Sequence, residues 1–148
     1  MAKLLYALLA SDVIIDRETG ASSFIRCFEH GAVRQFPAQV PPFYVASLWE
    51  LDPKRTAPFT VALQLRTPSG EKTLLGSNEV QPTGAILHKV NFRLPGIQVK
   101  EPGRHAIVVA LKDGDRQVKA AELPVYVVLA PADDKAAQAK AAPKPKKP

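Results

Sequence analysis

The chain has 148 residues, 46% of them hydrophobic, and a formal net charge of +6. This length suits one domain whose core is large enough to fold without cross-links. The single cysteine, Cys27, excludes an intramolecular disulfide, so we expect a reducing, cytoplasmic setting.

An apolar segment, residues 4–10, follows Lys3 near the start of the chain. It is at the short limit for the apolar part of a signal peptide, and Asp12 follows without a small-residue cleavage site. We therefore predict a buried central strand, although Leu and Ala leave a helix open by propensity. No other apolar run approaches the roughly 18 residues of a spanning helix, so we expect no membrane span.

Two β-prone segments, residues 13–15 and 22–28, flank the loop from Asp16 to Gly20. Asp commonly accepts hydrogen bonds from the backbone of its own turn, and Gly tolerates a positive φ. The pattern therefore predicts a hairpin. Prolines between residues 37 and 42 then predict an irregular crossing, because proline cannot donate to a strand ladder.

Further strands are predicted where apolar and polar residues alternate between turn residues. They cover residues 43–51, 59–66, 72–75, 86–94, 105–111 and 118–129. The turn at Asp113–Asp115 joins the last two in a hairpin, and Pro124 marks an edge or a change of sheet. Seven to nine strands at this spacing predict an immunoglobulin-like antiparallel β-sandwich over residues 1–129.

From residue 130 the composition changes to Lys, Pro and Ala. Residues 130–148 contain five Lys against two Asp and no aromatic or β-branched side chain. Such a segment buries too little apolar surface to offset an ordering cost of about 1–2 kcal/mol per residue. We predict a disordered Lys/Pro/Ala-rich tail.

Several residue pairs invite a chemical interpretation. Asp12 and Asp16 would lie about 13 Å apart on an extended strand, too far for one metal or one scissile bond. Cys27 and His30 should point to opposite faces, and we expect Cys27 to be buried on the face of Ile25.

His88 and His105 lie on strands that can be neighbours, but zinc requires three or four ligands. The glycines form no phosphate-binding loop, and neither G-x-S-x-G nor H-E-x-x-H occurs. The sequence thus predicts no catalytic residue, no cofactor and no metal site.

The tail holds the only concentrated chemistry. Lys140, Lys144, Lys146 and Lys147 can contact the phosphates of a nucleic acid or an anionic membrane. Without interleaved aromatic or arginine side chains such contact would be weak and unspecific. The simpler alternative is a solubilising extension.

Several segments are typical of one protein family. They are residues 3–9, Asp12, residues 16–20, Phe28-Glu29, residues 40–45 and residues 101–104. With them, residues 1–129 resemble an uncharacterised family of small bacterial all-β proteins. The resemblance implies a shared β-sandwich and no particular chemistry.

These observations predict a non-enzymatic module that binds another protein through a sheet face or an edge strand. One alternative is an adaptor whose basic tail contacts nucleic acid weakly while the sandwich binds elsewhere. A second alternative is an enzyme of an unfamiliar type. The oligomeric state stays open.

Overall fold

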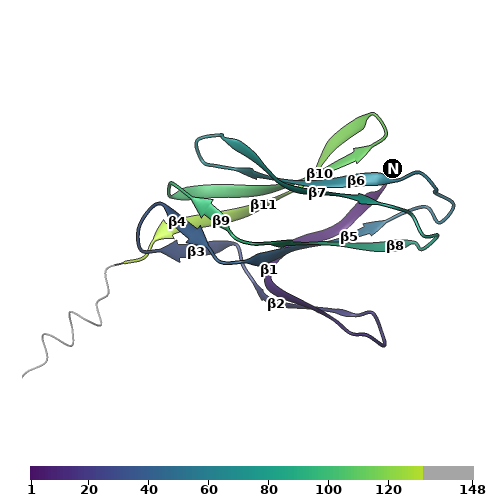
Figure 1. Ribbon diagram of the computed structural model, residues 1–148, viewed down its shortest axis with the longest axis horizontal. Helices are drawn as coiled ribbons and strands as arrows, with labels where there is room; N and C mark the ends of the chain where they lie inside the picture. Colours follow the sequence, from purple (N-terminus) through teal and green to yellow (C-terminus); the bar gives the residue numbers. More distant parts are fainter. Residues whose placement is uncertain (132–148) are drawn as a thin grey trace, which may run out of the picture.

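The computed structural model describes residues 1–131, which form an all-β structure without a helix (Figure 1). Its eleven strands are β1 (Lys3–Ile15), β2 (Ser22–Cys27), β3 (His30–Val33), β4 (Ala38–Val40), β5 (Phe43–Glu50), β6 (Phe59–Arg66), β7 (Lys72–Val80), β8 (Leu87–Leu94), β9 (Ile97–Val99), β10 (Gly103–Asp113) and β11 (Arg116–Leu129).

The strands form two large sheets and one small one. The first sheet has the order β2-β1-β5-β8, and all of its pairs are antiparallel. The second has the order β3-β11-β10-β6-β7, in which only β3 and β11 are parallel. Strands β4 and β9 pair with each other alone. The two large sheets lie face to face as two layers (Figure 1).

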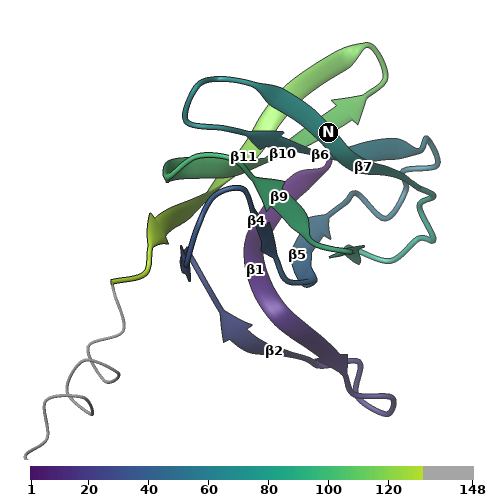
Figure 2. The same ribbon diagram turned by 60° about the vertical axis from the view of Figure 1, so that its left-hand side comes forward.

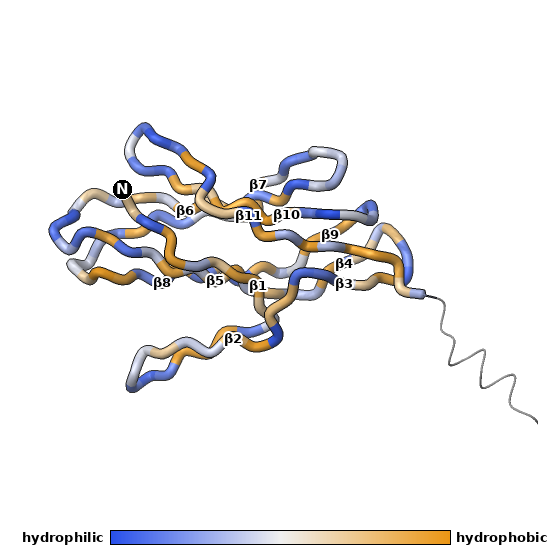
Figure 3. Tube along the Cα trace, turned by 180° about the vertical axis from the view of Figure 1, so that it is seen from behind, coloured by the Kyte–Doolittle hydropathy of each residue, from blue (hydrophilic) through white to orange (hydrophobic). Residues whose placement is uncertain are grey.

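The core lies between the inner faces of these sheets. On β6, Phe59, Val61, Leu63 and Leu65 are buried while the residues between them are half-exposed, as the alternation predicts. Seen from behind, hydrophobic residues recur along the strands and the hairpin tips are hydrophilic (Figure 3). The two layers meet where Trp49 of β5 contacts Phe59, with ring centroids 5.9 Å apart.

The buried polar groups beside Trp49 are paired. The indole Nε1 donates to Ser47 Oγ at 2.9 Å, and that hydroxyl donates to the Val90 carbonyl oxygen at 2.6 Å. Trp49 is fully buried, and Ser47 nearly so. Pairing removes the cost of burying an unsatisfied donor, so this short chain of hydrogen bonds fixes β5 against β8.

The N-terminal hairpin is confirmed. Residues 4–10 and 13–15 form one strand, β1, which pairs with β5 and then with β2. Pairing with β5 as far as Ala10 and with β2 from Ala10 onward outweighs the helix propensity of Leu and Ala. Asp16 Oδ1 accepts from the backbone N–H groups of Glu18 and Thr19, each at 2.8 Å, and Gly20 has φ +71°. These hydrogen bonds, above all the one from Thr19, hold the pKa of Asp16 below its ordinary value.

Strand β1 outruns β5, which it contacts only as far as Ala10. The rest of β1 and all of β2 therefore form an arm that leaves the body of the sandwich (Figure 2). We call residues 11–27 the arm. Because the arm lies outside the two layers, neither of its faces is covered by a second sheet.

Two finer expectations have different outcomes. Pro124 lies opposite Ala106, where β11 lacks an outer neighbour because β3 pairs only from Tyr126 onward, so the expected edge is confirmed. The seven to nine strands are not confirmed, since residues 1–131 form eleven. The additional ones include β3, β4 and β9, which are too short for alternation to reveal. Of the predicted disordered tail, residues 132–148 lie outside the described residues.

Candidate functional site

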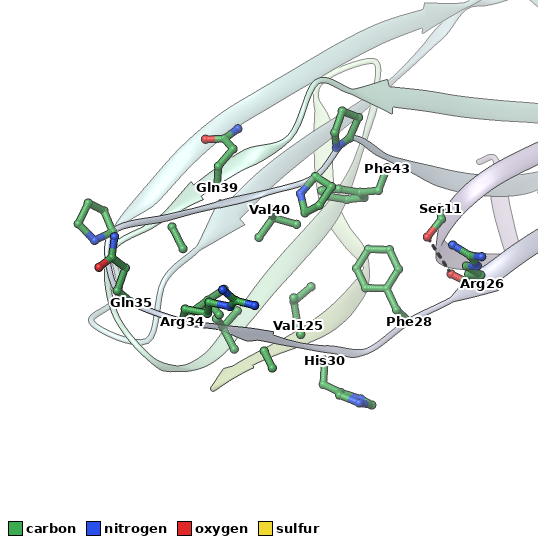
Figure 4. A pocket seen from close by; sticks show the side chains of 18 of the residues that line it. Ser11, Arg26, Phe28, His30, Arg34, Gln35, Gln39, Val40, Phe43 and Val125 are labelled. Atoms are coloured by element: carbon green, nitrogen blue, oxygen red, sulfur yellow. Dashed lines mark hydrogen bonds between the residues drawn. The ribbon is translucent and has the colours of Figure 1, made fainter. Parts of the chain in front are cut away.

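A mostly apolar pocket of about 620 Å³ lies beside β3 and β4, which are at one end of the sandwich (Figure 1). Most of residues 26–43, which lead from the arm into β5, line it together with Ser11, Val125 and Val127. We call it the end pocket. Phe28, Val40, Phe43 and Val125 point toward one another across it (Figure 4). A volume of this size is ordinary for a ligand site.

The end pocket stays open because the two short strands around it pair with different neighbours. Strand β3 pairs with β11, whereas β4 pairs with β9. Phe28 and Phe43 lie near the two ends of the loop formed by residues 26–43. Their rings meet edge to face with centroids 5.4 Å apart, which closes this loop. Since β3 and β4 do not pair with each other, the loop does not fill its own centre.

Both short strands present their main-chain edges to the end pocket. All four residues of β3 and all three of β4 line it. A strand that presented only one face would contribute alternate residues, because successive side chains point to opposite faces. Strand β3 is the outermost of its sheet and β4 has β9 alone, so within residues 1–131 each has one edge without a partner strand.

The hydrogen bonds of β3 show which groups are unused. The Glu29 oxygen accepts from Tyr126 N at 2.8 Å, and the Val33 oxygen accepts from Ala130 N at 2.7 Å. In a parallel pair, alternate residues direct their main-chain groups to the same neighbour. The N–H and C=O groups of His30 and Ala32 therefore point to the opposite edge.

The charged groups around the end pocket are cationic. Arg26 and Arg34 line it, and no Asp or Glu among residues 1–131 does. The ion pairs within those residues involve other arginines and Lys119, so neither Arg26 nor Arg34 has a carboxylate partner there. Arg34 extends along the pocket, whereas His30 points away from it (Figure 4). The site therefore combines an apolar interior with a positive rim.

Arg26 has an unusual backbone conformation. Its φ of +52° makes it the one non-glycine residue of the described chain in the left-handed region. That conformation costs an L-residue about 1–2 kcal/mol. It interrupts the pairing of β1 with β2 between Ile25 and Cys27, where Ser11 Oγ lies 3.5 Å from the Arg26 oxygen.

The prediction that Cys27 is buried beside Ile25 is wrong. Cys27 is exposed and lines the end pocket, and Ile25 is 38% exposed. The physical reason is that the arm has no second sheet to cover it, so Ile25 and Cys27 are both exposed.

The other sequence candidates do not assemble into a site. His88 lies on β8 and His105 on β10, in different sheets, so their strands are not neighbours. Asp12 Oδ1 accepts from the N–H of the adjacent Val13 at 2.8 Å. Within residues 1–131 no three His, Cys, Asp or Glu side chains are placed to hold a metal. The tail residues Lys140, Lys144, Lys146 and Lys147 lie outside the described part of the chain.

A second, more polar hollow of about 560 Å³ lies on the outer face of the second sheet. Arg66, Lys72 and Lys119 line it around Val108 and Ala110. One carboxylate, that of Glu122, forms ion pairs with Arg66, Arg104 and Lys119. Three basic side chains on this face therefore share one carboxylate.

Comparison with known proteins assigns the family. A model of a family of unknown function (DUF6941) matches residues 5–127, and the chain belongs to that family. No curated protein matches the chain. In the described residues we find no helix of the length and hydrophobicity needed to cross a membrane.

Proposed function

We propose that this chain is a non-enzymatic module that binds another protein, and that the end pocket is its binding site. The observation that carries the proposal is the combination of an apolar interior with two strand edges that have no partner within residues 1–131. Edge strands bind other chains through main-chain hydrogen bonds, and apolar cavities bind their side chains.

The chemistry of the lining supports a binding role over a catalytic one. General acid–base catalysis needs a proton donor and acceptor placed around a substrate. His30 is the one histidine of the described lining and points outward (Figure 4), and no carboxylate of residues 1–131 lines the pocket. An enzyme of an unfamiliar type is the second alternative.

Filling the pocket tests the proposal. Ala38 lines the pocket and lies on the same face of β4 as Val40, which points into it (Figure 4), so Ala38→Trp places an indole there. Ala85 is exposed and lies outside the lining, which makes Ala85→Trp the control. Each full-length protein is used to capture partners from a lysate of the cells that make it, with and without nuclease. We expect a protein that the wild type and the control retain and the Ala38→Trp variant loses. Equal capture by all three would contradict the proposal.

The first alternative is an adaptor that contacts nucleic acid through its basic groups. The basic hollow on the outer face of the second sheet favours it, in addition to the tail lysines. Capture that nuclease abolishes would support this alternative. If the tail alone binds, its five lysines limit the slope of log affinity against log salt to about −4.5. A steeper slope would implicate Arg66, Lys72 and Lys119.

The proposal includes an immunoglobulin-like sandwich from a bacterial cytoplasm. In the strand order, β5 lies beside β8 in one sheet, and β6, β10 and β11 are adjacent in the other. This arrangement matches the B–E and C–F–G neighbours of immunoglobulin domains and supports the fold assignment. The single cysteine supports a reducing compartment.

A further inference from the structure

We propose that the partner presents an extended acidic segment with a bulky apolar side chain, and that this segment adds as a strand to the open edge of β3. The inference rests on the proposed function, whose end pocket it uses. It adds the chemistry of the partner, which the presence of a pocket does not by itself specify.

The main-chain edge of β3 favours an extended polypeptide over a small molecule. The N–H and C=O groups of His30 and Ala32 point away from β11, and both residues line the pocket. A partner strand satisfies these groups with its own main chain, whereas a compact apolar ligand leaves them to water. With a side-chain period of two, alternate residues of such a strand then face the pocket interior.

The interior selects an apolar side chain. Phe28, Val40, Phe43 and Val125 converge on it (Figure 4). The first three lie in the loop that surrounds the pocket, and Val125 lies on the inner face of β11. One large aliphatic or aromatic side chain of the partner would shield these groups from water. Such a side chain is the usual anchor of a peptide in a groove.

The rim selects acidic neighbours for that anchor. Arg26 and Arg34 line the pocket without a carboxylate partner among residues 1–131. A guanidinium binds a carboxylate through paired N–H donors, and like charges repel a basic segment. Arg26 also keeps a left-handed backbone that glycine would adopt more readily. Strain of this kind is concentrated at binding sites.

The end of this chain is a poor occupant for the same site. Ala130 donates to Val33, so the following residues start beside β3. Residues 132–148, however, contain five Lys against two Asp and no apolar side chain larger than proline. Their charge repels Arg26 and Arg34, and they offer no anchor for the interior. A segment of another protein is therefore the occupant that charge complementarity supports.

A random heptapeptide library displayed on phage tests the proposal with the full-length protein. We expect the selected peptides to combine Asp or Glu with Leu, Ile, Phe or Trp, and to lose binding to the Ala38→Trp variant. Affinities of the synthesised peptides are then measured by fluorescence anisotropy. Arg34→Gln and Arg26→Gly should each weaken binding about two- to fivefold, the value of one carboxylate–arginine contact at an exposed site. Arg17→Gln, on the exposed tip of the arm, should change affinity less than about twofold.

Two features of the experiment distinguish a loss of binding from a loss of folding, and main-chain hydrogen bonds from side-chain contacts. Glycine suits the φ of residue 26, so Arg26→Gly should melt no lower than the wild type, and a loss of affinity then reports the lost guanidinium. Peptides methylated on alternate backbone nitrogens keep their side chains but cannot pair with a strand edge. We expect methylation in one of the two registers to weaken binding at least about tenfold, the value of lost main-chain hydrogen bonds.

Several results would overturn the inference. They are basic or uncharged consensus peptides, affinities that Arg26→Gly and Arg34→Gln leave unchanged, full tolerance of methylation in both registers, and failure to select any peptide that Ala38→Trp displaces. In each case, partner capture that is lost with Ala38→Trp would leave the proposed function standing. Capture of the same partner by Ala38→Trp and wild type alike would contradict both the inference and the proposed function.

Discussion

The carboxylate of Asp113 holds three parts of the fold together, and removing its charge should destabilise the protein in a pH-dependent way. Arg55 Nη1 and Nη2 donate to its two oxygens at 2.7 Å each, and the backbone nitrogen of Ala2 lies 3.3 Å away. The pair joins the loop before β6 to the end of β10, and the Asp113 and Arg55 side chains are only 16% and 13% exposed.

The magnitude follows from the number of bonds. A hydrogen bond to a charged group contributes about 1.5–3 kcal/mol when it is well buried. Asp113→Asn keeps one acceptor oxygen for Arg55 and loses the charge and one bond, and partial solvent contact reduces the effect. We therefore expect the variant to lose about 2 kcal/mol of unfolding free energy at pH 7.

The pH dependence has a definite sign. Hydrogen bonding from Arg55 holds the pKa of Asp113 below its ordinary value of 3.8. A carboxylate with a lowered pKa in the folded state adds stability above its unfolded pKa and loses it as the pH falls through the folded one. The difference between wild type and Asp113→Asn should therefore be constant from pH 7 to about pH 5 and shrink below about pH 4.

Urea unfolding of both proteins across this range measures the difference. Asp115→Asn, an exposed acid in the same turn, is the control and should stay within about ±0.5 kcal/mol. A loss below about 0.5 kcal/mol for Asp113→Asn at pH 7, or a difference unchanged at pH 3, would refute the reasoning.

Three further predictions concern the core, the thiol and the end of the chain. Ser47→Ala should cost about 1–3 kcal/mol in urea unfolding, because it leaves the buried Trp49 indole N–H without an acceptor; a cost near zero would mean that water replaces the hydroxyl. Cys27 should react with a thiol reagent in native buffer within a few-fold of its rate in denaturant, and strong protection would show that the arm is covered in solution. A chain that ends at Pro131 should unfold within about ±0.5 kcal/mol of the full chain, since the removed residues have a composition that cannot form a core; a larger loss would mean that they pack against it.

The parts of the fold that sequence predicts are those specified by local pattern. Strand β6 is an example, because its alternation records one buried and one exposed face. The turn at Asp16 is another, because Asp and Gly supply their own hydrogen bonds and backbone angle. In both cases the residues that determine the structure lie within the segment itself.

The candidate site is not of this kind. Strands β3 and β4 are three or four residues long and are defined by pairing with β11 and β9, some 60 to 100 residues away. The prolines of the crossing indicate an irregular loop, but not that it surrounds an open space. The left-handed backbone of Arg26 has no signature in the residue type, and Cys27 is exposed because the arm has no second sheet over it, which depends on where the other strands end.

Protection of Cys27 tests most directly whether the end pocket binds another protein. Cys27 lines the pocket and is the only cysteine, so its alkylation rate reports on the pocket alone. A Cys27→Ser, Leu74→Cys double variant moves the thiol to β7, where Leu74 is 63% exposed. In the presence of saturating captured partner, we predict alkylation of Cys27 at least about tenfold slower and alkylation at position 74 unchanged. An unchanged rate at Cys27 in a demonstrably formed complex would contradict the account.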